Sequence, residues 1–335
     1  MDRTQIHAGR DPAIVVIGGG TGLSTMLRGL KHYTKDLTAI VTMADDGGGS
    51  GVLRQELHMP PPGDVRNCIQ ALANTEPEME RLLAFRFTEG SLRGQSLGNL
   101  ILAALYEMSP SFDAAVRSLS RVLAITGQVL PVTTANVDLA AELEDGTSLF
   151  GQSKIGHRPA GGSPIRQLKL VPEHVTALPE VLEAIERAEM IVLGPGSLYT
   201  SVIPNLLADG VARAVRESDA VRVCVLNVMT QPGETEHYSG ADHLRTLFSY
   251  AGGPVSDWCL ISDTPLPPEL AARYLSEGAQ QVEPDEAGLR SLGVGLLRAD
   301  VTSFAGGLVR HDPDKLAREL IQLYRTQSPT RIYRT

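Results

Sequence analysis

The segment formed by residues 14–51 constrains the fold more than any other stretch of this sequence. It begins with four consecutive apolar residues, 14–17, which fit a strand buried on both faces of a parallel sheet. Glycines follow at once, and an apolar spacing of three and four residues then indicates a helix. The glycines are Gly18, Gly19, Gly20 and Gly22, and the helical positions are Leu23, Met26, Leu27 and Leu30.

This strand, glycine loop and helix predict half of a nucleotide site. Glycines let the backbone approach a ligand closely, and free N–H groups at a helix start favour an anion. The dinucleotide fingerprint fails because Leu23 occupies its third glycine position, and no Gly-Lys-Ser/Thr follows for a Walker loop. A second strand over 38–43 then leads to Asp45 and Asp46, where a ribose-binding carboxylate would lie. The alternative is that the glycines only form a tight turn.

Composition narrows the classes of function. With 335 residues, the chain is long enough for one large α/β domain or two small ones. Aromatic residues make up only 4% of the chain, which argues against base-stacking readers of single strands. The net charge of −9, without a sustained basic run, argues against nucleic-acid binding. Cys68, Cys224 and Cys259 lie far apart in apolar surroundings, so we expect buried thiols in a reducing, cytoplasmic compartment.

No apolar run is long enough to span a membrane, and the N-terminal residues lack the apolar core of a signal peptide. Residues 1–12 are therefore predicted to be a loose leader. Residues 129–156 change to an alternating pattern that turns at Asp145 and Gly146, which is typical of a hairpin. We expect an α/β fold with a mostly parallel sheet and a small antiparallel excursion.

A second block repeats the layout of the first. Residues 190–193 fit a buried strand, a turn of Gly194, Pro195, Gly196 and Ser197 follows, and residues 198–207 fit a helix that Pro204 kinks or restarts. Backbone amides exposed by such a turn, together with a serine hydroxyl, favour an anion site over a bare connection.

Further candidates lie at the ends of other elements. Asn67 follows Asp64, the expected N-cap of a helix over 65–73, and Asn99 lies in the first turn of a later helix, where a capping role is the alternative. A polar loop follows the strand predicted over 221–228, at an end where open α/β sheets bind ligands; its residues are Asn227, Met229, Thr230, Gln231 and Glu234. Arg310 precedes the last helix, either near an anion or simply solvated.

Six blocks in this order together resemble the YvcK family of gluconeogenesis factors: GGGTGLSTMLRGLK, ADDGGGSG, PPGDVRNC, SLGNLILAAL, LGPGSLYTSVIPNLL and NVMTQPGETEHYSGADHL. That family is similar to CofD, the 2-phospho-L-lactate transferase of deazaflavin coenzyme synthesis. The resemblance covers residues 13–325, which predicts one CofD-like domain followed by a tail, 326–335.

The resemblance implies a Rossmann-like three-layer α/β/α fold and a cytoplasmic bacterial protein linked to gluconeogenic growth and cell shape. It implies binding of a UDP-sugar such as UDP-N-acetylglucosamine. Carried over by motif, the ligand-binding residues are Gly18, Gly19, Gly20, Thr21, Gly22, Asp45, Asp46, Asn67, Asn99, Gly194, Pro195, Gly196, Ser197, Asn227, Met229, Thr230, Gln231 and Arg310, the last on the sugar diphosphate.

Three positions depart from the family pattern, in which serine, histidine and glutamate stand where this chain has Gly49, Gln95 and Gln152. Losing a histidine and a glutamate removes two groups suited to proton transfer or metal binding, so a regulatory binding protein that requires no cofactor is favoured. The alternative is a CofD-like transferase in which Asp45 and Asp46 hold Mg²⁺ on a nucleotide donor. The sequence assigns no catalytic residue, leaves open a homo-oligomer, and identifies no protein partner.

Overall fold

A seven-stranded parallel sheet forms the centre of the computed structural model, which describes residues 11–331. Its strand order is β10-β9-β8-β7-β1-β2-β3, and every neighbouring pair is parallel. The strands are β1 (Ile14–Gly18), β2 (Leu37–Val41), β3 (Gln128–Pro131), β7 (Met190–Leu193), β8 (Val221–Val225), β9 (Trp258–Ser262) and β10 (Gly295–Ala299).

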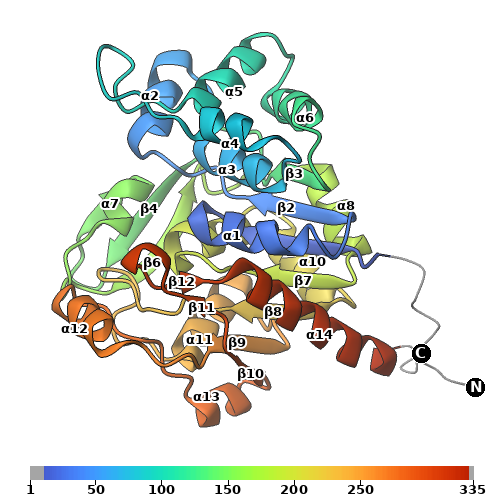
Figure 1. Cartoon of the computed structure of the whole chain (residues 1–335). Helices are drawn as coiled ribbons and strands as arrows, with labels where there is room; N and C mark the ends of the chain where they lie inside the picture. Colours follow the sequence, from blue (N-terminus) through green and yellow to red (C-terminus); the bar gives the residue numbers. More distant parts are fainter. Residues whose placement is uncertain (1–10, 332–335) are drawn as a thin grey trace, which may run out of the picture.

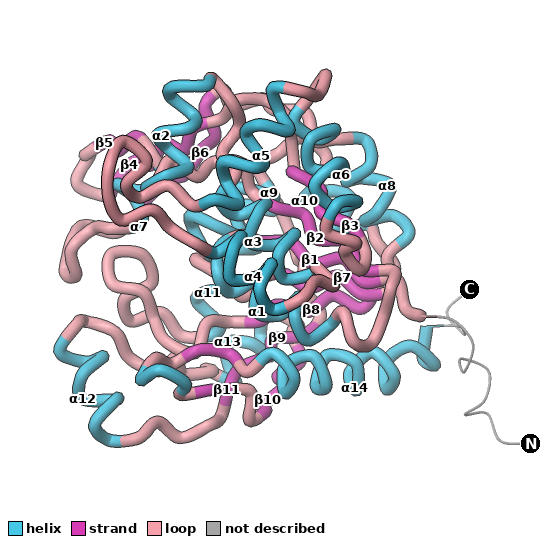
Figure 2. The backbone as a smooth tube through the Cα atoms, turned by 45° about the horizontal axis from the view of Figure 1, so that its top comes forward, coloured by secondary structure: helices cyan, strands magenta, loops and turns pink. Residues whose placement is uncertain are grey.

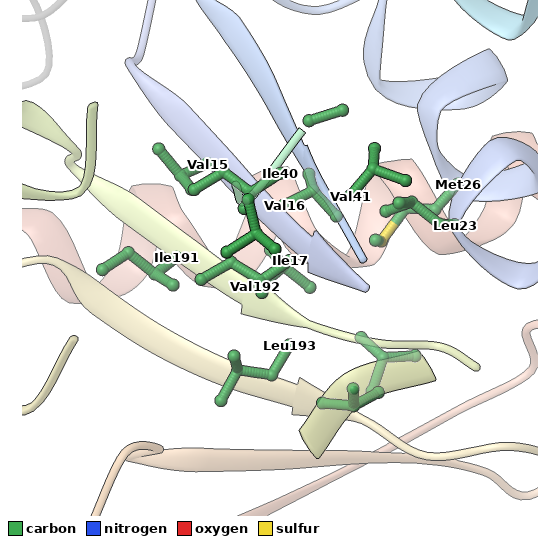
Figure 3. Close-up of a cluster of buried hydrophobic side chains, with 14 of the residues drawn as sticks. Val15, Val16, Ile17, Leu23, Met26, Ile40, Val41, Ile191, Val192 and Leu193 are labelled. Carbon is green, nitrogen blue, oxygen red and sulfur yellow. The ribbon is translucent and has the colours of Figure 1, made fainter. Parts of the chain in front are cut away.

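The middle strands are buried on both faces because their sequences are continuously apolar. Every residue of β1, β2 and β7 is buried, as expected for a parallel sheet covered by helices on each side. Figure 3 shows these side chains meeting the apolar face of the first helix, with Leu23 and Met26 beside Val41. The core therefore lies directly behind the glycine loops.

The direction in which the chain builds this sheet reverses once. From β1 it proceeds through β2 to the β3 edge, and it then returns to the other side of β1 and adds β7, β8, β9 and β10 in turn. The reversal lies between β1 and β7. In open α/β sheets, ligands bind outside the carboxyl ends of the strands at such a switch point.

Helices cover both faces of the sheet, because right-handed crossovers built in opposite directions place their helices on opposite faces. One face carries α1 (Gly20–Leu30), α3 (Gly63–Leu72) and α14 (Pro313–Arg331), and α1 and α14 lie across the front in Figure 1. The π-helix η2 (Leu198–Val202) and helices α8 (Pro179–Arg187), α9 (Ile203–Leu206), α10 (Val211–Glu217) and α11 (Gly240–Ala251) belong to the other face.

The pair α1 and α14 packs closely because Gly29 faces the start of α14. A β-carbon at Gly29 would lie 2.0 Å from the Pro313 carbonyl oxygen, so any side chain there would push the two helices apart. The last helix of the chain is thereby fixed against the helix that follows the first glycine loop.

The connection from β2 to β3 contains a group of helices that lies above the sheet in Figure 1. These are α2 (Gly48–Leu57), α4 (Pro77–Ala84), α5 (Leu97–Glu107) and α6 (Phe112–Val122), together with α3. The chain after β9 contributes α12 (Pro268–Ser276), α13 (Glu286–Ser291), the short 3₁₀-helix η3 (Ala305–Gly307) and the two-stranded sheet of β11 (Thr302–Ser303) and β12 (Arg310–His311).

A separate antiparallel sheet lies beside α2 and α7 (Gln152–Gly156), as Figure 2 shows. Its strands are β4 (Asp138–Leu143), β5 (Ser148–Phe150) and β6 (Ile165–Val171), in the order β5-β4-β6. Burial alternates along β4, which is typical of a sheet with one face in the core. Gly146 takes a φ of 86° in the hairpin turn, a value that favours glycine.

The Rossmann-like α/β fold with an antiparallel excursion is confirmed, although the excursion lies later than predicted. Residues 128–131 form the edge strand β3 of the main sheet, and the small sheet ends only at Val171, since β6 adds a third strand. All three cysteines are buried and unpaired, as expected. Most of the predicted leader and residues 332–335 of the predicted tail lie outside the described residues, while α14 runs to Arg331.

Candidate functional site

The two glycine loops meet at the switch point of the sheet. Strands β1 and β7 pair in register with Ile17 opposite Leu193, so both loops begin at the same height. A β-carbon at Gly22 would lie 2.6 Å from the Pro195 carbonyl oxygen, and one at Gly196 would lie 3.3 Å from the Gly19 carbonyl oxygen. The backbones are therefore in direct contact, and side chains are excluded from the space between them.

A cavity of about 410 Å³ opens in front of the loops. This volume falls within the range of small-molecule sites. Besides the loops, its walls come from the segment after β8, from α12 and from β12. Of the predicted ligand residues, those that line it are Gly19, Gly20, Thr21, Gly22, Gly196, Ser197, Asn227, Met229, Thr230, Gln231 and Arg310.

The remaining predicted ligand residues are not among those that line this cavity. Three of them belong to the two glycine loops themselves: Gly18, Gly194 and Pro195. The other four lie in the helical connection between β2 and β3: Asp45, Asp46, Asn67 and Asn99. Among these, Asn99 is buried, and its Oδ1 accepts a hydrogen bond of 3.1 Å from Nε of Arg66. Its backbone N–H is capped by Ser96 Oγ. The Asn99 side chain therefore orients the buried side chain of Arg66.

Asp46 points toward the small antiparallel sheet. Its Oδ1 accepts hydrogen bonds from both the backbone N–H and the hydroxyl of Ser153, at 2.7 and 2.6 Å. Because Ser153 lies in the first turn of α7, Asp46 supplies an acceptor to the start of that helix. The two neighbouring aspartates that the sequence suggested as a pair thus face different partners.

Asp45 instead lies near Asp64, which the sequence suggested only as a helix cap. The N-cap of α3 is Pro62, and the carboxylate of Asp64 accepts a hydrogen bond from the Gly20 N–H at the start of α1. A β-carbon at Gly19 would lie 2.7 Å from Asp64 Oδ2. Burial, and then the charge of Asp45, raise the pKa of Asp64 to about 7. Burial also raises the pKa of Asp45, whose Oδ1 accepts from the Gly47 N–H at 2.9 Å.

A buried acid, Glu234, lies behind the other loop. Glu234 accepts hydrogen bonds from the Thr200 hydroxyl at 3.0 Å and from the Tyr199 N–H at 3.3 Å, in the first turn of η2. Burial raises the pKa of Glu234 to about 7, although its hydrogen bonds to Thr200 and Tyr199 oppose the shift. Each glycine loop is thus followed by a helix whose first turn contacts a carboxyl group, that of the partly buried Asp64 at α1 and that of the buried Glu234 at η2.

The arginine and histidine of β12 complete the cavity wall. Arg310 is exposed at its rim, and His311 is buried, with Nε2 lacking a hydrogen-bond partner within the described residues. Burial lowers the pKa of His311 to about 4, so its ring is neutral at physiological pH. Arg310 is thus the cation of this wall.

The described residues contain no group of three or more His, Cys, Asp or Glu side chains placed to hold a metal ion. None of their helices is long and apolar enough to cross a bilayer.

Comparison with known proteins identifies the family. Residues 14–302 match the model of the family described as 2-phospho-L-lactate transferase CofD. The chain belongs to the CofD family. It is 50% identical over 313 residues to a protein of Thermoanaerobacterium thermosulfurigenes, which covers 93% of this chain and 97% of that one. It is 45% identical over 316 residues to the gluconeogenesis factor of Bacillus subtilis, which covers 94% and 99%.

A crystal structure of this CofD-family branch superposes closely. The Bacillus halodurans protein BH3568, described as a member of the UPF0052 family, aligns with a TM-score of 0.89 at 43% identity, over 93% of this chain and 100% of that one. The gluconeogenesis-factor resemblance inferred from the sequence motifs is therefore confirmed.

In this member of the CofD family, three residues next to the loops make contacts that the sequence did not predict: Asp64, expected only as a helix cap, Glu234, expected only within the polar loop after β8, and Asn205. Asp64 and Glu234 contact the first turns of α1 and η2 from distant segments, so no local pattern indicates these contacts. Asn205, by contrast, carries a weak signal, because an asparagine within an apolar helical stretch is uncommon and needs partners.

Proposed function

We propose that this protein binds a nucleotide-sugar, such as UDP-N-acetylglucosamine, and acts as a regulatory protein rather than an enzyme. The observation that carries the proposal is the meeting of two glycine loops in front of a cavity of about 410 Å³ with Arg310 at its rim. Free backbone N–H groups and the start of the eleven-residue helix α1 favour a phosphate group. A diphosphate has two phosphate groups, one for each of the two adjacent loops.

The rest of the cavity suits the remainder of such a ligand. Apolar surface comes from Val228, Met229, Ala279 and Val309, and the polar side chain of Gln231 is available for hydroxyl groups or a base edge. Arg310 would pair with the diphosphate, where its charge adds to the backbone donors. Glu277, also in the lining, would accept from sugar hydroxyls.

A regulatory role is supported by how the acidic groups are used. The carboxylate of Asp46 accepts a hydrogen bond from Ser153, and that of Glu234 accepts one from Thr200. Positions 95 and 152 carry glutamine side chains, which do not titrate. The names of the relatives support a link between this binding and gluconeogenic carbon metabolism. We extend the proposal to cell shape on the family resemblance alone.

Calorimetric titration with UDP-N-acetylglucosamine tests the proposal. The wild-type protein is expected to bind one ligand per chain, and Arg310→Ala to bind at least about tenfold more weakly through loss of a charge-assisted contact. Arg298→Ala is the matched control, because Arg298 is an arginine on β10 that pairs with Glu286 at 2.6 Å outside the cavity. An equal loss in both variants would contradict the assignment of Arg310.

A transferase of the CofD type is the second candidate, and the neighbouring, partly buried carboxyl groups of Asp45 and Asp64 favour it. Carboxylate oxygens suit Mg²⁺, which binds to one or two carboxylates together with substrate phosphates. These two residues fit that requirement beside Gly20, whereas Asp46 does not, because its carboxylate is turned toward α7. When bound, Mg²⁺ would neutralise charge on a nucleotide donor.

The transferase candidate is tested by incubating the protein with nucleotide-activated phospholactate, a deazaflavin acceptor and Mg²⁺. Mass-spectrometric detection of the phospholactylated deazaflavin, lost in Asp64→Asn and retained in Asp46→Asn, would support it. A broad acceptor screen without product would count against it.

A further inference from the structure

The side chain of Asn227 contacts the backbone of the second glycine loop at two points. Its Oδ1 accepts a hydrogen bond from the Gly196 N–H at 3.1 Å, and its Nδ2 donates to the Gly196 carbonyl oxygen at 3.1 Å. A primary amide that pairs with both polar groups of one residue fixes the orientation of the peptides on either side of it. Gly196 precedes Ser197, and both residues line the cavity.

Other contacts hold the surrounding backbone rigidly. Asn205 is fully buried, and its Nδ2 donates to the carbonyl oxygens of Gly18 at 3.0 Å and of Ser201 at 2.8 Å. One side chain thus joins the end of β1 to the helix after β7. Glu234 fixes the Tyr199 N–H in the same helix. None of these contacts involves the Gly196 peptide, which is held instead by the Asn227 side chain.

We infer that Asn227 is a positioning residue, which fixes the Gly196 peptide and thereby sets the following Ser197 amide in the orientation that a phosphate group requires. This role differs from the direct ligand contact that the sequence suggested. The inference rests on the proposed function for the identity of the ligand, but the arrangement of the loop can be measured without one.

Pre-orientation has a direct consequence for affinity. A loop whose donors already point into the cavity loses little conformational freedom on binding, whereas a loosened loop must be ordered first. Because Gly196 has no side chain and takes a φ of 159°, its own conformational preferences do little to restrict this peptide. The restriction comes from the Asn227 amide.

A direct contact between Asn227 and the ligand is the competing explanation, since Asn227 also lines the cavity. The two roles predict different patterns of loss. A positioning residue affects every ligand that uses the loop for phosphate, so pyrophosphate and UDP should weaken by the same factor. A contact to the sugar or base would spare pyrophosphate.

Hydrogen–deuterium exchange of the full-length, ligand-free protein tests the inference, using peptides that contain Gly196 and Ser197. The variants are Asn227→Ala and Asn227→Leu, the second of which keeps most of the volume, and melting curves establish that each is folded. Thr25→Ala is the matched control, because Thr25 lines the same cavity from α1 without a side-chain hydrogen bond to another described residue. We expect exchange at least about tenfold faster in either Asn227 variant and unchanged in the control.

Calorimetry on the same proteins, with pyrophosphate and UDP as probes, should show an equal loss of roughly tenfold for both ligands in the Asn227 variants. Wild-type exchange rates in a folded Asn227 variant would overturn the inference, and so would a loss confined to UDP. If the wild-type protein binds neither probe, the proposed function fails, and faster exchange in the variants would still support the positioning role on its own.

Discussion

Gly22 on the first loop lies directly against the carbonyl oxygen of Pro195 on the second. A β-carbon at Gly22 would lie 2.6 Å from that oxygen and 2.9 Å from the carbonyl carbon. Both atoms belong to backbone, which moves less readily than the end of a side chain. The spacing of the two loops therefore depends on the absence of a side chain at this one position.

Gly22→Ala is accordingly expected to push the loops apart. We predict a loss of about 1–3 kcal/mol in the free energy of unfolding, as for other overpacked sites, together with a loss of nucleotide-sugar affinity. Urea denaturation and calorimetry measure the two effects.

Gly18→Ala provides the control from the same loop. A β-carbon there would make only ordinary contacts, the nearest at 3.8 Å to Gly194. A variant that binds as tightly as wild type is expected, and a Gly22→Ala protein that binds equally well would show that the close approach does not matter for the ligand.

Asp46 is predicted to act on stability rather than on binding. Asp46→Ala removes the acceptor for the Ser153 N–H and hydroxyl, which should cost about 1–2 kcal/mol, as for other lost helix caps. Ligand affinity should stay within about twofold of wild type, because an uninvolved group contributes less than half a kcal/mol.

A double-mutant cycle with Ser153→Ala separates this role from others. Coupling between the two substitutions in urea denaturation is expected, since they remove the same contact. Additive losses of stability would contradict the contact between Asp46 and Ser153. An Asp46→Ala protein that no longer binds ligand would show that Asp46 belongs to the binding site.

Glu234 should make stability depend on pH. Its pKa is raised to about 7, mainly by burial, so the folded protein retains a proton that the unfolded chain releases near the ordinary value of 4.5. Stability is therefore highest below that value and is lost as the pH rises through about 7. The loss attributable to this group is no more than about 3 kcal/mol.

Urea denaturation at pH 5 and pH 8 checks this dependence. Glu234→Gln carries no titrating group and should lose less stability than wild type between the two values. Identical pH dependence in both proteins would mean that Glu234 ionises in the folded state as easily as in the unfolded chain.

Local sequence patterns were sufficient to predict those elements whose structure depends only on neighbouring residues in the chain. The strand, glycine loop and helix at Gly18 and at Gly194 are each encoded within about ten residues, so their positions followed from periodicity and turn chemistry. The hairpin around Gly146 followed in the same way.

Features that depend on distant segments could not be predicted. Helix α2 begins in a glycine run that disfavours a helix, and those glycines instead allow close packing, since a β-carbon at Gly49 would lie 2.8 Å from Gln95 Oε1. Asp64 has the sequence context of a cap, yet its carboxylate faces Gly20. Only the sheet order brings these groups together.

The measurement that tests the central claim most directly is a calorimetric titration of the wild-type protein with UDP-N-acetylglucosamine, UDP-glucose and GTP. The two-loop cavity predicts saturable binding of at least one UDP-sugar at one site per chain, weakened by Gly22→Ala and Arg310→Ala. Absence of heat with every UDP-sugar, in protein shown to be folded, would contradict it.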